Sequence, residues 1–245
     1  MRLKVPNLPE KKVTLCAAAN KKSIVSALKK LGIETVSPHP CESIDNEVAC
    51  HADMLLCQVD RNTVFTEPSQ TSLSKKLKDI GFNVFFSEMP EKKYPGDVRL
   101  NFAVGADFIL GNFAVADKTL FEFFKKSGKK LINVKQGYAK CSLCFVSSDA
   151  FITEDDGIAK ALIKEKKDVL LISKGDVYLS EKHYGFFGGA SGKISERFLA
   201  VTGGIEHHRD AKAILDFTKK HGVELIKLTA GKITDIGGIL PLTEE

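Results

Sequence analysis

The residues whose spacing most suggests chemistry are Cys141 and Cys144, a Cys-x-x-Cys pair in the segment QGYAKCSLCFV. Such a pair can form half of a zinc site, act as a redox pair or have no shared chemistry. The flanking residues predict a strand, on which side chains three positions apart point to opposite faces. No second Cys or His pair follows at zinc-finger spacing, because the next histidine is His183. We therefore predict no zinc and no disulfide, with Cys144 in the core and Cys141, beside Lys140, as the candidate reactive thiol.

A second pair of residues that could take part in catalysis or binding is His51 and Asp53, in the segment ACHADMLLCQV. Residues two positions apart share one face of a strand, so a strand here would point both side chains the same way. An imidazole can transfer protons, and a carboxylate can hold a planar cation through paired hydrogen bonds. The alternative is structural: a histidine that caps a loop and an aspartate that stabilises a turn. The sequence leaves both open.

The glycine-rich segment GFFGGASGKIS has some features of a phosphate-binding loop. That motif needs Gly, four residues, and then Gly-Lys followed by Ser or Thr. Phe187 stands where the first glycine belongs, and Ile194 follows Lys193. We predict no nucleotide site here and expect the glycines to let backbone segments approach closely.

The elements that must position these residues recur along the chain. In SLSKKLKDIGFNVFFSE, Leu73, Leu77 and Ile80 mark one face of a helix, Gly81 ends it, and a short strand follows. Two short strands joined by a turn precede each such helix, as in KCSLCFV-SSD-AFIT. Five units are predicted, at approximately residues 235–245 joined to 12–40, 51–88, 97–136, 140–175 and 186–230.

One of the five units is divided between the two ends of the chain. DIGGILPL supplies its first strand and KVTLCAAAN its second, so the strand at 13–19 must pair with the one around 237–242. A single unit cannot bury the apolar face of its helix alone, whereas five units arranged around an axis can. A doubly wound sheet is the alternative. We predict one α/β domain over residues 1–245, a five-bladed ββαβ propeller with pseudo-five-fold symmetry, closed by its terminal strands.

This arrangement resembles the pentein, or guanidino-group-modifying enzyme, superfamily, which includes arginine and agmatine deiminases, dimethylarginine hydrolases and amidinotransferases. The resemblance covers the chain from about residue 13 to residue 245. ACHADMLLCQV is similar to the His-x-Asp at a strand start in those hydrolases, with His51 and Asp53 in the matching positions. KQGYAKCS is similar to an uncharacterised branch of these folds. DIGGILPLTEE is similar to the glycine-rich terminal strand, but Ile239 or Leu240 stands where the family has its nucleophilic cysteine.

The resemblance implies that the beginning of each unit's first strand points at the central axis. Guanidino chemistry needs a thiolate to attack the central carbon, an imidazole to transfer protons and a carboxylate to hold the cation. We expect Cys141 to be the nucleophile, with its thiolate favoured by Lys140 or His51, His51 to be the acid/base and Asp53 to anchor the cation. The expected ligand-binding residues are Asp53, Arg99, Asn101, Lys140, Ser191, Lys193 and Asp235.

The function implied is a pentein with an axial pocket for a small cationic guanidino- or amino-acid-like ligand. It would be a Cys-dependent amidinohydrolase or amidinotransferase that uses no cofactor or metal. Because a fold does not fix a function, two alternatives stay open. One is a non-catalytic pentein that serves in binding or in recognition of the ribosome, and the other is a carrier or sensor without turnover.

Composition narrows the class of protein. With 43% hydrophobic and 27% charged residues, the 245-residue chain has the balance of a globular protein. Lysine pairs spread over the predicted helices give a formal charge of only +5, so no nucleic-acid partner is expected apart from the ribosome. No segment has the apolar length of a membrane span or the pattern of a signal peptide, so we expect a cytoplasmic protein with reduced cysteines. The sequence does not indicate an oligomeric state.

Overall fold

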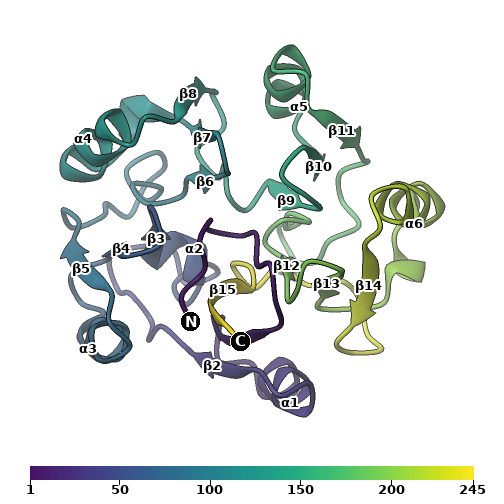
Figure 1. Cartoon of the computed structure of the whole chain (residues 1–245), viewed down its shortest axis with the longest axis horizontal. Helices are drawn as coiled ribbons and strands as arrows, with labels where there is room; N and C mark the ends of the chain where they lie inside the picture. Colours follow the sequence, from purple (N-terminus) through teal and green to yellow (C-terminus); the bar gives the residue numbers. More distant parts are fainter.

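The computed structural model describes all 245 residues as a ring of five blades (Figure 1). Each blade is a three-stranded sheet in which the first and middle strands are antiparallel and the middle and outer strands are parallel. The first strands and the short helix α2 (Ala52–Leu55) lie near the axis, and the five longer helices lie on the outside. The predicted α/β class and five-bladed ββαβ propeller are confirmed.

In every blade the elements follow the order strand, strand, helix and strand, to which α2, η1 and η2 are additions. Blade 1 contains β15 (Leu240–Glu244), β1 (Val13–Ala17), α1 (Lys22–Lys30) and β2 (Glu34–Val36). Blade 2 contains α2 (Ala52–Leu55), β3 (Leu56–Gln58), β4 (Thr63–Thr66), α3 (Thr71–Asp79) and β5 (Asn83–Phe86). Blade 3 contains β6 (Ala103–Val104), β7 (Phe108–Gly111), η1 (Phe113–Val115), α4 (Lys118–Lys126) and β8 (Lys130–Asn133). Blade 4 contains β9 (Leu143–Phe145), β10 (Ala150–Thr153), α5 (Asp156–Lys164) and β11 (Asp168–Leu171). Blade 5 contains β12 (Ser191–Lys193), β13 (Phe198–Val201), η2 (Ile205–His207), α6 (Ala211–Lys220) and β14 (Glu224–Lys227).

Local sequence explains where the helices begin and end. The carboxylate of Asp155 accepts a hydrogen bond from Ile158 N at 2.8 Å and so caps the start of α5. Gly128, just past α4, has a φ of 72°, a left-handed conformation that stops a helix at little cost for glycine. After α5, which lacks such a glycine, Lys166 takes this conformation with a φ of 61°.

The apolar core lies between neighbouring blades. One cluster joins Cys144 and Ile152 of blade 4 to Leu199 of blade 5, and another joins Val13 of blade 1 to Ala200 of blade 5. Cys144 is thus a core residue, as predicted. Because each blade completes its core against the next, the apolar faces are all covered only when the ring closes.

The two ends of the chain close the ring. Strand β1 pairs antiparallel with β15, with Val13 opposite Glu244 and Ala17 opposite Leu240, which confirms the predicted pairing of the terminal strands. The N-terminal segment adds a tie that the sequence did not predict. The side chain of Asn7 donates to Val104 O in blade 3 at 3.1 Å.

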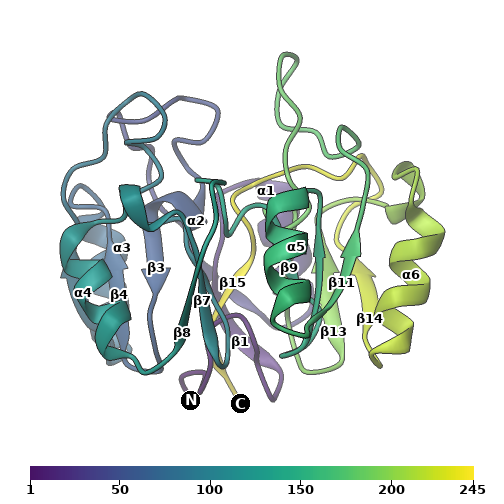
Figure 2. The same ribbon diagram turned by 90° about the horizontal axis from the view of Figure 1, so that it is seen from above.

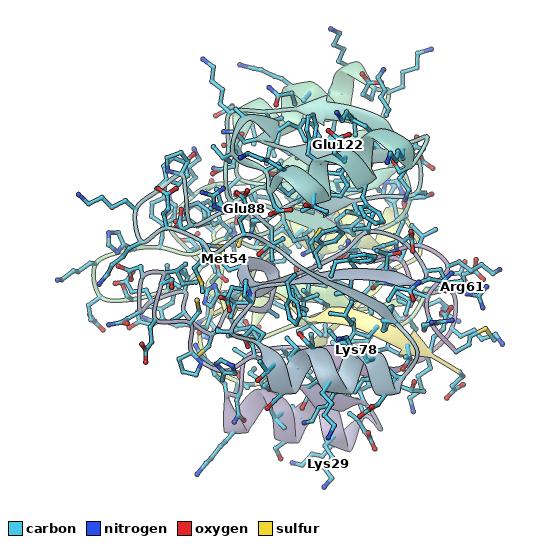
Figure 3. The ribbon with its side chains drawn as sticks, turned by 90° about the vertical axis from the view of Figure 1, so that its left-hand side faces the viewer. Lys29, Met54, Arg61, Lys78, Glu88 and Glu122 are labelled. Atoms are coloured by element: carbon cyan, nitrogen blue, oxygen red, sulfur yellow. The ribbon has the colours of Figure 1, made fainter.

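The two faces of the ring differ. Both chain ends emerge on one face, and long loops rise from the other (Figure 2). Around the outside, Lys29 of α1 and Lys78 of α3 project into solvent (Figure 3). No helix combines the length and the apolar character that crossing a membrane requires.

Candidate active site at the axis

The polar residues at the axis lie in turns that precede the first strand of each blade. The prediction that His51, Asp53 and Cys141 lie on strands is wrong. Asp53 lies in the short helix α2, after His51, and the strand begins only at Leu56. Cys141 lies in a turn in which Ser142 N donates to Tyr138 O at 3.0 Å, ahead of β9. These turns carry the side chains past the strand ends and onto the axis.

Cys141 is held by residues from two other blades. Its thiol donates to Asp53 Oδ2 of blade 2 at 3.0 Å and accepts from Asn101 Nδ2 of blade 3 at 3.1 Å. Asn101 also donates to Asp53 O at 3.0 Å, and its Oδ1 accepts from Lys140 N at 2.7 Å. The amide of Asn101 therefore fixes the Cys141 turn against α2. Of the axial residues predicted from sequence, Asp53, Asn101 and Cys141 are thus in direct hydrogen-bond contact.

The expectation that a basic neighbour favours the Cys141 thiolate is not met. The pKa of Cys141 is raised well above its usual range, first by burial and then by the negative charges of Asp53 and Asp235. Burial is also the main cause that raises the pKa of Asp53. In the unliganded protein the sulfur is thus held as a thiol that donates to a carboxylate, and two acids, rather than a base, dominate its surroundings.

A second pair, His51 and Asp235, lies beside the thiol. His51 Nδ1 lies 3.6 Å from Asp235 Oδ1 and has no hydrogen-bond partner. Asp235 accepts backbone hydrogen bonds from Phe186 N and Gly237 N at 2.9 Å each. These donors orient the carboxylate, while His51 Nδ1 is left without a hydrogen bond.

A cavity of about 490 Å³ opens above this group on the loop-bearing face. His51, Cys141 and Asp235 line it, whereas Asp53 does not and lies behind the thiol. Its walls come from loops of four blades, around residues 45–48, 92–97, 138 and 179–186. The axial carboxylate that meets the cavity is therefore Asp235, and Asp53 acts on the site through Cys141.

Aromatic rings form part of the cavity wall. Tyr94 stacks on Tyr138 with ring centroids 5.6 Å apart, and Tyr138 in turn lies 6.2 Å from Phe186. Aromatic faces beside carboxylates attract organic cations. The cavity thus combines a thiol, an imidazole, carboxylates and aromatic surface, a set suited to a planar cation.

Sequence reasoning missed two acids near this site, Asp97 and Glu154. Asp97 is 3% exposed, lines the cavity and accepts from Tyr138 Oη at 2.6 Å. Glu154 accepts from Phe187 N at 2.6 Å, and burial raises its pKa to about 8. The only feature of the sequence that pointed to Asp97 as a site residue was its position at the beginning of a unit. Its partner Tyr138 is 41 residues away and becomes its neighbour only through the fold.

Arg99 is not brought to the cavity. Its guanidinium donates to Glu88 Oε2 at 3.2 Å and to Glu91 Oε1 at 2.8 Å, away from the axis. The expectation that Arg99 is axial is wrong, because residues 99–101 form a turn and only Asn101 is left pointing inward.

Three further predicted residues border small cavities of about 10–20 Å³ that Asn7 also lines. These residues are Lys140, Ser191 and Lys193, and all three are buried. Ser191 Oγ donates to Phe187 O at 2.7 Å, and burial lowers the pKa of Lys193 to about 8. None of them lines the 490 Å³ cavity, so they do not form one site with Cys141. No group of three or more His, Cys, Asp or Glu side chains is arranged to hold a metal ion.

Comparison with protein families gives one match. Residues 15–240 match a family described as a family of unknown function (DUF6873). The chain belongs to the DUF6873 family. Comparison with curated protein sequences finds no match.

Several solved structures with the same fold are named as enzymes that act on guanidino compounds. Inosamine-phosphate amidinotransferase from Streptomyces griseus aligns with a TM-score of 0.58 at 10% identity, over 100% of the DUF6873 chain and 97% of its own. DDAH from Pseudomonas aeruginosa in complex with citrulline aligns with 0.56 at 9%, over 95% and 100%. Agmatine deiminase from C. jejuni aligns with 0.55 at 12%, over 94% and 90%. At identities this low the alignments show the fold alone. They confirm that the DUF6873 chain has the pentein fold.

Proposed function

We propose that this DUF6873 protein binds a small guanidino compound in the axial cavity and modifies it through Cys141, as a hydrolase or a transferase acting on a C–N bond. The observation that carries the proposal is the placement of Cys141, His51 and Asp235 together on the cavity floor. The names of the solved pentein structures, among them an amidinotransferase and an agmatine deiminase, agree with this choice of substrate.

The cation is held by Asp235 rather than by Asp53. A guanidinium presents paired N–H donors that match a carboxylate, and Asp235 is the axial carboxylate that meets the cavity. Two backbone donors keep Asp235 oriented. Asp53 lies behind the thiol and acts as the general base for Cys141.

Binding of the cation prepares the thiol for attack. In the free protein Asp53 and Asp235 both raise the pKa of Cys141. A guanidinium beside Asp235 offsets that negative charge and lowers the thiol pKa. The thiolate therefore forms when the substrate is in place, and the proton passes to Asp53 Oδ2, 3.0 Å from the sulfur.

The reaction then proceeds in two steps. The sulfur electron pair forms a C–S bond to the central guanidino carbon, and the C–N bond to one nitrogen breaks as His51 gives that nitrogen a proton. If the alkylamine leaves, an amidino group remains on Cys141, and if ammonia leaves, the group that remains keeps the alkyl chain. Attack by water releases a urea-type product in a hydrolase, whereas attack by a second amine gives a new guanidine in a transferase.

The nucleophile comes from a different blade than the resemblance implies. Ile239 and Leu240, in the place of the usual C-terminal cysteine, are buried in apolar clusters of the core. Cys141 of blade 4 is the cysteine that lines the cavity instead. We take this as a relocation of the thiol around the ring. The ribosome-binding alternative has no observation in its favour.

Mass spectrometry of quenched reactions tests this function. The protein is incubated with n-butylguanidine or with agmatine, quenched in acid and digested. On the peptide that contains Cys141 we expect the mass of an amidino group if the amine is released, or of an N-alkylamidino group if ammonia is released. Cys50→Ala, which removes a half-buried thiol outside the cavity, should retain both the adduct and the released amine or ammonia. Product formed by Cys141→Ala, or turnover without any adduct on Cys141, would contradict the proposed role.

A further inference from the structure

We infer that Asp97 forms a second cation site in the same cavity, so that the ligand carries an amine at the end remote from its guanidino group. This inference rests on the proposed function and names the class of substrate: a guanidino-amine with a positive charge at each end. The observation that points to it is a buried carboxylate oxygen on the cavity wall that has no partner in the protein.

Asp97 is only half satisfied by its neighbours. Tyr138 Oη donates to Asp97 Oδ2 at 2.6 Å, while Asp97 Oδ1 is buried and has no hydrogen-bond partner. A buried carboxylate oxygen without a donor costs free energy, which a donor from a ligand would recover. Burial raises the pKa of Asp97, and a bound ammonium group would return the carboxyl toward its ionised form.

The other two acids on this wall are already engaged. Asp45 Oδ1 accepts from Glu47 N at 2.9 Å, and Asp45 is exposed to solvent. Glu47 Oε2 lies 2.8 Å from His183 Nδ1. Asp97 is thus the acid on this wall that is buried and has a carboxylate oxygen without a donor.

The position of Asp97 suits the far end of a ligand held at Cys141. Its partner Tyr138 belongs to the turn that carries Cys141, because Ser142 N bonds to Tyr138 O. The two sites therefore share Tyr138, whose hydroxyl bonds to Asp97 and whose backbone belongs to the Cys141 turn. Tyr94 stacks on the ring of Tyr138, so this part of the cavity wall is aromatic and suits the methylene chain of a guanidino-amine.

A carboxylate at the far end of the ligand is the competing possibility. The lysines that line the cavity, Lys92 and Lys182, are exposed and have no ion-pair partner in the protein. Their charges stay solvated, so they contribute less to binding than a buried and pre-oriented carboxylate does. The buried wall of the cavity selects for positive charge.

Calorimetric binding of three matched compounds tests the inference. n-Butylguanidine is the parent, agmatine adds a terminal amine, and 4-guanidinobutanoate ends in a carboxylate on a chain of the same length. We expect agmatine to bind about 10- to 100-fold more tightly than n-butylguanidine, as for a hydrogen bond to a buried charge. We expect 4-guanidinobutanoate to bind no more tightly than n-butylguanidine. Asp97→Asn should bring the ratio for agmatine close to one.

Asp79→Asn is the matched control, because it removes the same charge at an exposed site without an ion-pair partner, and should keep the ratio. The ligand series in the unmutated protein decides the matter even if Asp97→Asn does not fold. Equal affinities for agmatine and n-butylguanidine, or tighter binding of 4-guanidinobutanoate, would overturn the role of Asp97 and leave the proposed function intact. Failure of all three compounds to bind would overturn both.

Discussion

At the scale of single residues, burial raises the pKa of acids around the axis, among them Asp53, Asp97 and Glu154. Glu154 accepts from Phe187 N, and the adjacent Phe186 N donates to Asp235, so two carboxylates hold consecutive backbone groups of one loop. The pKa of Glu154 is raised from 4.5 to about 8, mainly by burial. The folded protein therefore keeps a proton on Glu154 near neutral pH that the unfolded chain has lost.

This difference predicts how stability changes with pH. Between about pH 4.5 and pH 8 the folded state binds the extra proton, so the contribution of Glu154 to stability falls as pH rises through this window. The loss should be on the order of 3–5 kcal/mol across the window. Glu154→Gln, which stays neutral and keeps an oxygen for Phe187 N, should flatten the curve. Urea unfolding at several pH values measures this.

Glu42→Gln provides the control for that measurement, because Glu42 is exposed. The Glu42→Gln variant should follow the unmutated protein at every pH. A Glu154→Gln variant with the same slope as the unmutated protein would mean that Glu154 is already ionised in the folded state.

At the scale of elements, the turn at residues 187–190 connects three blades through backbone contacts. Gly189 N donates to Cys141 O of blade 4 at 2.8 Å, and Gly189 O accepts from Ile236 N and Gly238 N at 2.9 and 2.7 Å. A Cβ at position 189 would lie 2.2 Å from Asp235 Oδ1. Only glycine lets this turn approach the carboxylate so closely.

Gly189→Ala should therefore move Asp235 and weaken the cation site. We expect a loss of about tenfold in n-butylguanidine affinity, the value of one disturbed charge-assisted hydrogen bond, and about 1–3 kcal/mol of stability. Gly231→Ala is the control, because a Cβ there meets nothing closer than 4.0 Å. Calorimetry and urea unfolding give the two numbers. Equal affinities in the two variants would show that Asp235 does not bind the cation.

At the scale of the whole molecule, stability depends on closure of the ring rather than on any one blade. The chain ends lie side by side, with the Met1 amino group bonded to Glu244 O, and the break in the chain falls between the first and second strands of blade 1. The equivalent break in blade 2 lies in the exposed turn at residues 60–62. Moving the break by one blade keeps every interface between blades.

A circular permutant tests this symmetry. With residues 1 and 245 joined by a flexible linker and new ends between Arg61 and Asn62, the protein should be soluble and give the circular dichroism spectrum of the native order. Deletion of residues 237–245 should instead expose an edge of β1 and cause aggregation. A soluble truncated protein with unchanged melting would contradict the dependence on closure.

The fold could be predicted because its signals are local and repeated. The apolar face of the helix that ends at Gly81 marks one unit within a short segment of the sequence. The unpaired strands at the two ends of the chain indicate how the ring closes. The site could be predicted only in part. Cys141 and Asn101 meet across 40 residues and were expected on the axis, but Tyr138 and Asp97 become partners only through loop packing. No motif indicated that Glu88 and Glu91 would pair with Arg99 and keep it from the axis.

The pKa of Cys141 with and without a bound cation tests the central claim most directly. The thiolate can be titrated by ultraviolet absorbance as the difference between the unmutated protein and Cys141→Ser, first alone and then saturated with n-butylguanidine. A guanidinium beside Asp235 should lower the thiol pKa from its raised value in the free protein, because it offsets the negative charge of Asp235. A titration that n-butylguanidine leaves unchanged would contradict a guanidino site at Cys141.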